Sequence, residues 1–335
     1  MTRDSTMDSR SDMTVPDGGG PPGLFSAREA IHQLRQVGQV TLGLVVLYAA
    51  FLVLSPQFRN IDTFLTVLTQ ATILAVLASG TTVVLISGGL DLSVGSIFAV
   101  VGVAVGILLV DYQWPVWLAV AAGLFIGTAC GFANGLVQVT TKVPAFIVTL
   151  GGLTAYRGLA EKLANGKDLS RFPPAFKTIG AGYLVPISIM LGVALLTWIF
   201  LTRTRIGNHA YAIGGNAEVA RLSGVNVARS RVIYYPFGGL TAAIAAIIQT
   251  SRLDFAQSSR GVSYELFAIA AVVIGGTSLF GGRGGVMRTT VGMLILQTIT
   301  VGLSYLGVDT STQRIAIGII IILAVYLDVL QRKVS

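Results

Sequence analysis

Residues 202–231 read TRTRIGNHAYAIGGNAEVARLSGVNVARSR and form a polar segment between two long apolar runs. The segment contains five arginines, at positions 203, 205, 221, 229 and 231. A simple turn between two membrane helices needs far fewer residues. We therefore expect a membrane protein in which the stretch of about 203–231 forms a polar surface that docks a partner.

The composition supports a membrane protein. Hydrophobic residues make up 53% of the 335 residues and charged residues only 11%, against roughly 25% charged residues in soluble domains. The mean hydropathy is +0.76. Glycine is abundant, with 40 residues, and proline is scarce, with 10, a balance that suits closely packed membrane helices. The sequence therefore predicts an all-α, polytopic integral membrane protein.

The net charge of +8 does not indicate nucleic-acid binding, because the basic residues flank apolar runs and do not form one stripe. Anionic membrane lipid and the cytoplasmic placement of basic loops account for them. The single cysteine, Cys130, lies inside an apolar run, so the sequence contains no disulfide framework.

The apolar runs predict one transmembrane permease domain over residues 26–335, preceded by a polar segment, 1–25, that we expect to be a disordered cytoplasmic tail. We count about ten transmembrane helices. With the amino terminus inside, most of the 23 lysines and arginines fall on the cytoplasmic side, as does the 203–230 loop. The ten runs are 38–55, 63–86, 93–111, 115–139, 144–160, 182–202, 231–250, 265–281, 287–306 and 313–331.

The polar segment contains a short helix with recognisable ends. Asn216 is a suitable N-cap, and Gly224 suits the left-handed position that ends a helix. Glu218 and Arg221 can pair at i, i+3, while Val219 and Leu222 share another face. A two-turn helix is unstable alone, so we expect it to be held between the bundle and a partner. The alternative is a solvated loop that only orients the protein. The body of the expected helix is Ala217, Glu218, Val219, Ala220, Arg221, Leu222 and Ser223.

Residues 87–95, SGGLDLSVG, interrupt two apolar runs with almost no loop. Asp91 and Ser93 can cap the following helix, and the glycines permit a tight turn. Non-helical backbone at membrane depth is tolerated where protein buries it or water reaches it, and transporters use such broken helices. The break is a candidate path or gate; alternatively, Asp91 only caps a helix end near the interface. The candidate residues are Ser87, Gly88, Gly89, Asp91, Ser93 and Gly95.

A second glycine-rich break spans residues 275–285, with Gly275, Gly276 and Thr277 as candidates for the path. It shares a rough pattern with the first break, VVIGGTS against VVLISGG, which hints at an internal duplication. The chain contains no G-x-x-x-x-G-K-[ST] motif for binding a nucleotide phosphate.

The run at 115–139 contains a glycine every fourth residue, at positions 123, 127, 131 and 135. This spacing makes one smooth helix face, which we expect another helix to approach closely; a dimer contact and path lining are alternatives. Asn134 lies beside the stripe, where it either bonds a neighbouring helix or faces the path.

Catalytic constellations are missing from the sequence. The two histidines, His32 and His209, are far apart, so we expect no metal site, no bound cofactor and no catalytic residues. An ion-coupled secondary transporter would need a paired carboxylate or a histidine relay in the membrane, and Asp91 is the one candidate. A third class, an uncoupled anchor or channel, leaves the docking helix unexplained.

Four motifs, in order, resemble the ribose/xylose/arabinose/galactoside class of ATP-binding-cassette importer permeases. The resemblance covers about residues 40–330. The motifs are GGLDLSVG at 88–95, KVPAFIVTLGG at 142–152 followed by Arg157-Gly158, GNHAYAIGGNAEVARLSGVNVARSR at 207–231, and SYELFAIAAVVIGGTSLFGGRG at 263–284.

The resemblance implies a multi-pass subunit of the bacterial cytoplasmic (inner) membrane, usually a homodimer. Such a subunit imports a monosaccharide or related polyol from a periplasmic or lipoprotein binding protein, and a separate ATPase uses ATP to power it. Residues 217–224 correspond to the coupling helix that sits in the ATPase. Two positions depart from the family pattern: Phe267 stands where an aspartate is common, and Arg288 where a glycine is common.

Overall fold

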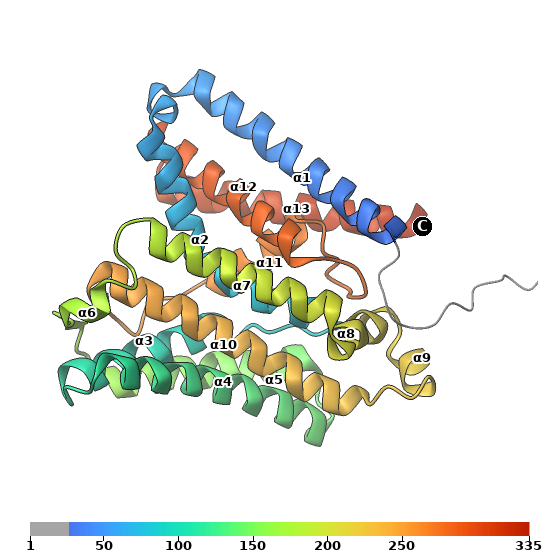
Figure 1. The fold of residues 1–335 in the computed structure, drawn as a ribbon, viewed down its shortest axis with the longest axis horizontal. Coiled ribbons are helices and arrows are strands. Elements are labelled where there is room, and N and C mark those ends of the chain that lie inside the picture. Colours follow the sequence, from blue (N-terminus) through green and yellow to red (C-terminus); the bar gives the residue numbers. More distant parts are fainter. Residues whose placement is uncertain (1–26, 335) are drawn as a thin grey trace, which may run out of the picture.

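The computed structural model describes residues 27–334, so the expected tail at 1–25 lies outside the described residues. The described chain is almost entirely helical, which confirms the all-α class (Figure 1). A 3-10 turn (Pro56–Arg59) and two short strands, β1 (Leu169–Ser170) and β2 (Phe255–Ala256), are the other elements in this part of the chain. The helices are α1 (Ala27–Leu54), α2 (Ile61–Ile86), α3 (Val94–Val110), α4 (Val116–Thr141), α5 (Ala145–Ala164), α6 (Pro174–Lys177), α7 (Leu184–Arg203), α8 (Arg205–Gly215), α9 (Ala217–Leu222), α10 (Val227–Leu253), α11 (Tyr264–Ile274), α12 (Val286–Tyr305) and α13 (Thr310–Val334).

Each of the ten apolar runs contains a helix, but six of the described helices are both long and apolar enough to cross a membrane: α1, α2, α4, α7, α10 and α12. The apolar parts of α3, α11 and α13 are shorter, and α5 carries Arg157, Glu161 and Lys162 in its second half. The chain is thus a multi-helix membrane protein. The count of ten membrane crossings remains a prediction.

The run at 265–281 behaves differently from the expectation. Its helix, α11, ends at Ile274 after 11 residues, which span about 16 Å, roughly half of the hydrocarbon layer. Gly275 and Gly276 follow, and Gly276 has a φ of +77°. Glycine adopts this left-handed conformation without steric cost. The chain therefore leaves the helix inside the bundle.

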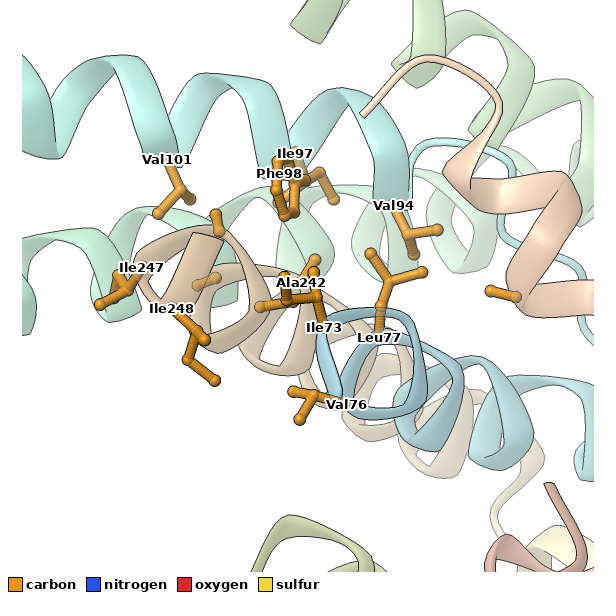
Figure 2. Packing of buried hydrophobic residues seen from close by; sticks show 14 of the residues in the cluster. Ile73, Val76, Leu77, Val94, Ile97, Phe98, Val101, Ala242, Ile247 and Ile248 are labelled. Carbon is orange, nitrogen blue, oxygen red and sulfur yellow. The ribbon is translucent and has the colours of Figure 1, made fainter. Parts of the chain in front are cut away.

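Most of the packed core lies where α2, α3 and α10 meet. Figure 2 shows side chains from the three helices gathered together, among them Leu77 of α2, Ile97 of α3 and Ala242 of α10. In lipid, tight van der Waals packing holds helices together, because lipid tails are as apolar as the side chains. More than half of the apolar window of α2 and of α10 is buried inside the protein. These two helices therefore form the centre of the bundle.

The glycine stripe of α4 packs against α10, which confirms the packing interpretation. A Cβ on Gly131 would lie 2.3 Å from the carbonyl oxygen of Tyr235, and one on Gly127 would lie 2.6 Å from that of Gly239. Real Cβ atoms do not approach so closely. The two backbones therefore touch along this line, as small residues allow between membrane helices.

The two ends of the bundle differ. At one end lie α8, α9, the start of α1 and the end of α13 (Figure 1). At the other end β1 pairs antiparallel with β2, with Leu169 opposite Ala256. There Asp254, which ends α10, pairs with Lys177 and accepts a 2.8 Å hydrogen bond from the Phe172 backbone N–H. Arg157 of α5 donates to the backbone oxygens of Ser258 and Arg260, which holds the α10–α11 loop in place.

Candidate functional site

The polar segment contains two helices, α8 and α9, where the sequence indicated one. The hydroxyl of Thr204 accepts a 3.0 Å hydrogen bond from the Gly207 N–H and caps α8. Asn216 caps α9 as expected, since its Oδ1 accepts from the backbone N–H groups of Glu218 and Val219 at 3.0 and 3.1 Å. Helix α10 then begins at Val227, four residues earlier than the apolar run suggests.

Helix α9 ends as the sequence predicts, although one residue sooner. Its last residue is Leu222, Ser223 is the C-cap, and Gly224 has a φ of +86°. The Val225 N–H donates to the Ala220 carbonyl and the Gly224 N–H to the Arg221 carbonyl, both at 3.0 Å. This pair of bonds is the Schellman arrangement, which satisfies carbonyls that a helix end would otherwise leave without partners.

One side of α9 is buried and the other is open. Ala220 is buried in an apolar cluster with Leu201, Ala210 and Tyr234. Val219 and Leu222 are 57% and 73% exposed. Two apolar side chains left in water on a helix that the bundle already holds suit contact with a partner.

The polar face of α9 carries an ion pair at the expected spacing. The Arg221 Nε lies 3.0 Å from the Glu218 Oε2. The hydrogen bond and the positive charge of Arg221 hold the pKa of Glu218 below its ordinary value. The pair is solvent-exposed, so water screens it and it adds little to the stability of the helix.

The end of α8 touches both glycine-rich breaks. The Gly282 N–H donates a 2.9 Å hydrogen bond to the Ile86 carbonyl, which joins the second break to the end of α2. A Cβ on Gly214 would lie 1.9 Å from that carbonyl oxygen and 2.5 Å from the Gly282 nitrogen. One on Gly281 would lie 2.9 Å from the Gly88 backbone. We call Gly88, Gly214, Gly281 and Gly282 the glycine junction.

The two breaks have the same local geometry. Gly88 and Gly276 have φ angles of +75° and +77°. In the first break Gly89 N–H bonds to the Val84 carbonyl and Gly88 N–H to the Leu85 carbonyl; in the second, Thr277 and Gly276 bond to Val272 and Val273 in the same pattern. Both helices thus end in a Schellman motif. The similar sequences VVLISGG and VVIGGTS therefore encode the same helix ending.

The Asp91 side chain lies inside the protein. It is 1% exposed, and its Oδ1 accepts from the backbone N–H and the hydroxyl of Ser93 at 2.9 and 2.6 Å. Ser93 is at the N-cap of α3 but makes no side-chain cap bond. The expected cap is thus replaced by a turn in which Asp91 holds Ser93. Within the described part of the chain, the Asp91 Oδ2 has no hydrogen-bond partner.

Asn134 connects this turn to two other helices. Its Nδ2 donates to the Ser93 hydroxyl at 2.8 Å, and its Oδ1 accepts from the Tyr156 hydroxyl at 3.0 Å. The chain Asp91–Ser93–Asn134–Tyr156 thus joins the first break to α4 and α5. Asn134 therefore bonds a neighbouring helix, one of the two roles that its position in the sequence allowed.

The other candidate path residues differ in exposure: Ser87, Gly95, Gly275 and Thr277 are buried, Gly89 is half-buried, and Gly88 and Gly276 are exposed. Ser87 donates to the Val84 carbonyl at 2.7 Å, and the Thr277 hydroxyl accepts from the Gly285 N–H at 3.1 Å. Gly275 packs against α12, since its Cβ would lie 2.5 Å from the Arg288 carbonyl oxygen. Gly95 lies away from the other candidates, next to the start of α11: a Cβ at this position would contact Glu265 and Gly261. The side chains of Ser87 and Thr277 are therefore packed in this conformation, while Gly88 and Gly276 reach the surface.

The two residues that depart from the family pattern occupy different surroundings. Phe267 is partly buried against the core on α11. Arg288 lies on α12 near the second break, where its Nη1 is 3.6 Å from the position that a Gly276 Cβ would take. Among the described residues no three His, Cys, Asp or Glu side chains gather as a metal site would require.

A polar cavity lies away from all of the residues that the sequence singled out. Its volume is about 310 Å³, and α2, α10, α11 and α12 surround it. The signal that could have found it is an amide side chain inside three apolar runs, in TQAT at 69–72, IIQTS at 247–251 and LILQTIT at 294–300. The cavity is lined by Gln70, Ile73, Leu74, Gln249, Arg252, Leu253, Tyr264 and Gln297.

The fold and these elements agree with comparisons to known proteins. A family model described as the permease component of branched-chain amino acid transport systems matches residues 63–325. The chain belongs to this permease family. The matched region includes both breaks, α8, α9 and the cavity. No solved structure matches the chain.

Similar proteins with curated functions are sugar permeases. The ribose import permease protein RbsC of Haemophilus influenzae is 40% identical over 86% of this chain and 91% of its own length, and that of Bacillus subtilis is 41% identical with the same coverage. The fructose import permease protein FrcC of Rhizobium meliloti is 32% identical over 98% of this chain and 94% of its own length. These relatives are transport subunits and not enzymes.

Proposed function

We propose that this chain is the membrane-spanning permease subunit of an ATP-binding-cassette importer for a monosaccharide or related polyol in the bacterial cytoplasmic membrane. The observation that carries the proposal is similarity to sugar import permeases over almost the whole chain. A permease protein of the D-allose transport system from Escherichia coli is also 34% identical over 87% of the chain. The shared theme is a neutral, hydroxyl-rich solute.

The exposed side of α9 provides the contact with the ATPase subunit. Val219 and Leu222 enter a groove of the partner, while Asn216 and Gly224 set the two ends of the helix. This chain binds no cofactor, and ATP is consumed by the partner. ATP changes the transport conformation only because it binds the two states of the ATPase with different affinity.

The glycine junction carries movement from α9 into the membrane. Helix α8 connects α9 to the end of α2 and to Gly282 in the second break through backbone contacts that leave no room for a side chain. A displacement of α9 must therefore shift both breaks or separate α8 from them. Alternating access follows if the breaks open on one side when the ATPase subunits close.

The assembly that we propose contains two copies of this chain, with about ten crossings in each. The amino and carboxyl ends and α8–α9 face the cytoplasm, and a periplasmic or lipoprotein sugar-binding protein delivers the solute to the opposite end. Native mass spectrometry of the detergent-solubilised complex measures this stoichiometry. We expect the mass of two permease chains and two ATPase chains. A single permease chain in active complexes would contradict the homodimer.

Transport in proteoliposomes tests the function itself. Uptake of ribose, fructose, allose and galactose is measured with the permease, its ATPase and its binding protein, with ATP inside or outside. We expect uptake of at least one sugar to need all three proteins, to survive collapse of the ion gradient and to stop when the ATPase Walker lysine is changed. Gradient-driven uptake by the permease alone would support the ion-coupled alternative.

A further inference from the structure

The polar cavity lies in the half of the bundle that is far from α8 and α9. Gln70 is about 14 Å along α2 from its start at Ile61, and Arg252 and Tyr264 are in the last turn of α10 and the first turn of α11. These are the ends that approach β2 and the Lys177–Asp254 pair. Under the proposed topology, the cavity is therefore reached from the extracytoplasmic side.

The cavity offers hydrogen-bond donors and acceptors together with apolar surface. Gln249 and Gln297 are 8% and 7% exposed, while Gln70 lies at the open side. An amide group both donates and accepts, so it can pair with the hydroxyl groups of a neutral solute. Ile73, Leu74 and Leu253 supply apolar walls, and among the described residues that line the cavity none carries a carboxylate.

The amides satisfy one another when the cavity holds no solute. Gln297 Nε2 donates to Gln70 Oε1 at 2.6 Å, and the Gln249 amide and the Tyr264 hydroxyl lie within 3.0–3.1 Å of each other. Arg252 donates to the Thr69 carbonyl at 3.1 Å. Buried polar groups need partners, and a solute with several hydroxyls can replace these bonds one for one.

The helices around the cavity are the ones that lead to the breaks. Helix α2 ends at the first break, α11 ends at the second, and α12 begins after it. A solute that bonds to α2 and α12 at once through Gln70 and Gln297 therefore responds to any change in their separation. A cavity elsewhere in the bundle would lack this connection.

We propose that this cavity is the contact site for the transported solute, an uncharged polyhydroxy compound, and that Gln249 and Gln297 are its main hydrogen-bonding residues. The proposal rests on the proposed transport function and names the residues that carry out one step of it. The volume of about 310 Å³ is at the lower end of the range of about 300–1,000 Å³ for small-molecule sites, which suits one monosaccharide.

The first test uses the full complex with Gln249→Leu or Gln297→Leu in the permease. The control is Gln313→Leu, because Gln313 is equally buried, at 7% exposed, but bonds to Ser304 and Val308 outside the cavity. Uptake is measured for the sugar that the unaltered complex transports, together with complex yield and ATPase rate. We expect uptake to fall about tenfold or more in both cavity variants, from the loss of one or two hydrogen bonds, at unchanged yield.

The outcomes separate this inference from the transport function. Normal uptake by both cavity variants, or an equal loss in Gln313→Leu, would overturn the cavity site while the importer assignment stood. An unaltered complex that takes up no sugar with ATP would instead refute the transport function. ATP hydrolysis that continues without uptake in the cavity variants would support a site that holds the solute.

A second test does not depend on the stability of the glutamine variants. In a Cys130→Ser background, Leu253→Cys places a thiol on the cavity wall and Val262→Cys places one on exposed surface outside it. Both are labelled with a charged, water-soluble thiol reagent in the assembled complex, with and without the transported sugar and its binding protein. We expect sugar to slow labelling at position 253 and not at 262. Equal rates with and without sugar at 253 would rule out occupancy of the cavity.

Discussion

Val219 and Leu222 are the two apolar residues of α9 that we expect to contact the ATPase, and Leu222 is the more exposed of them. Its side chain is 73% exposed on a helix whose opposite side is already packed against the bundle. Leu222→Asp would place an unpaired charge in the groove of the ATPase, at a cost of several kcal/mol of association. We expect co-purification of the ATPase to be lost while membrane insertion and yield stay normal.

The control for Leu222→Asp is Leu306→Asp, an exposed leucine at the opposite end of the bundle. It changes the same residue type in the same way but lies far from α9. Equal recovery of the ATPase with Leu222→Asp and Leu306→Asp would show that α9 does not dock it.

Asp91 serves as an acceptor for two hydrogen bonds from Ser93. An amide oxygen can accept the same bonds, so Asp91→Asn should reduce ATP-driven uptake only moderately. Asp91→Leu leaves the backbone N–H and the hydroxyl of Ser93 without their acceptor, which costs about 1–3 kcal/mol. The thermal stability of the detergent-purified permease measures this cost. Loss of uptake in Asp91→Asn at unchanged stability would show that the charge itself takes part in transport.

At the scale of whole elements, the proposed coupling depends on the two glycine-rich breaks and on α8, which touches both. Helices α2 and α11 both end in a Schellman motif. Helix α8 lies against the end of α2 and against Gly282 in the second break through the glycine junction. Glycine at these positions permits left-handed backbone and close approach. The junction is therefore sensitive to a single methyl group.

Gly214 and Gly215 provide a matched pair for testing the junction. A Cβ on Gly214 would lie 1.9 Å from the Ile86 carbonyl oxygen, whereas one on Gly215 would have no atom within 4 Å. We expect Gly214→Ala to force α8 away from the breaks, at about 1–3 kcal/mol for overpacking, and to reduce sugar uptake more than ATPase binding. Gly215→Ala should behave like the unaltered protein in both assays. Similar uptake by the two variants would contradict a coupling role for the junction.

At the scale of the whole molecule, the described conformation buries the serine side chains in and just after the first break. Ser87 and Ser96 are 2% and 1% exposed, yet alternating access requires water to reach the path in one state. In a Cys130→Ser background, Ser87→Cys and Ser96→Cys should be inert at rest and react with a water-soluble thiol reagent during ATP turnover. Ser79→Cys, packed in the middle of α2, is the control and should stay inert throughout. Inert thiols at 87 and 96 in every state would make the break a packed turn only.

The sequence alone determined the membrane class, the two breaks and the ends of α9, because each depends on composition or on residues that are close in the chain. Asn216 caps a helix through groups two and three residues away, and a Gly-Gly pair after an apolar run ends a helix by its own backbone freedom. The sequence did not predict helix α8, because this helix depends on tertiary packing more than on its local sequence. Its glycines weaken the local signal, and packing of Ala210 and Ile213 into the bundle stabilises it.

Only the tertiary structure decided what these local features touch. The bond from Asn134 to Ser93 joins residues 41 apart in the chain, and the bond from Gln297 to Gln70 joins residues 227 apart. Neither contact can be predicted from the hydrophobic periodicity of the sequence, because the order of helices in a bundle is set by which faces pack most closely. The glycine junction likewise needs α2, α8 and the 275–285 segment to meet. The sequence thus determined the parts of a transport subunit, and the packing of the bundle determined where the polar cavity and the glycine junction lie.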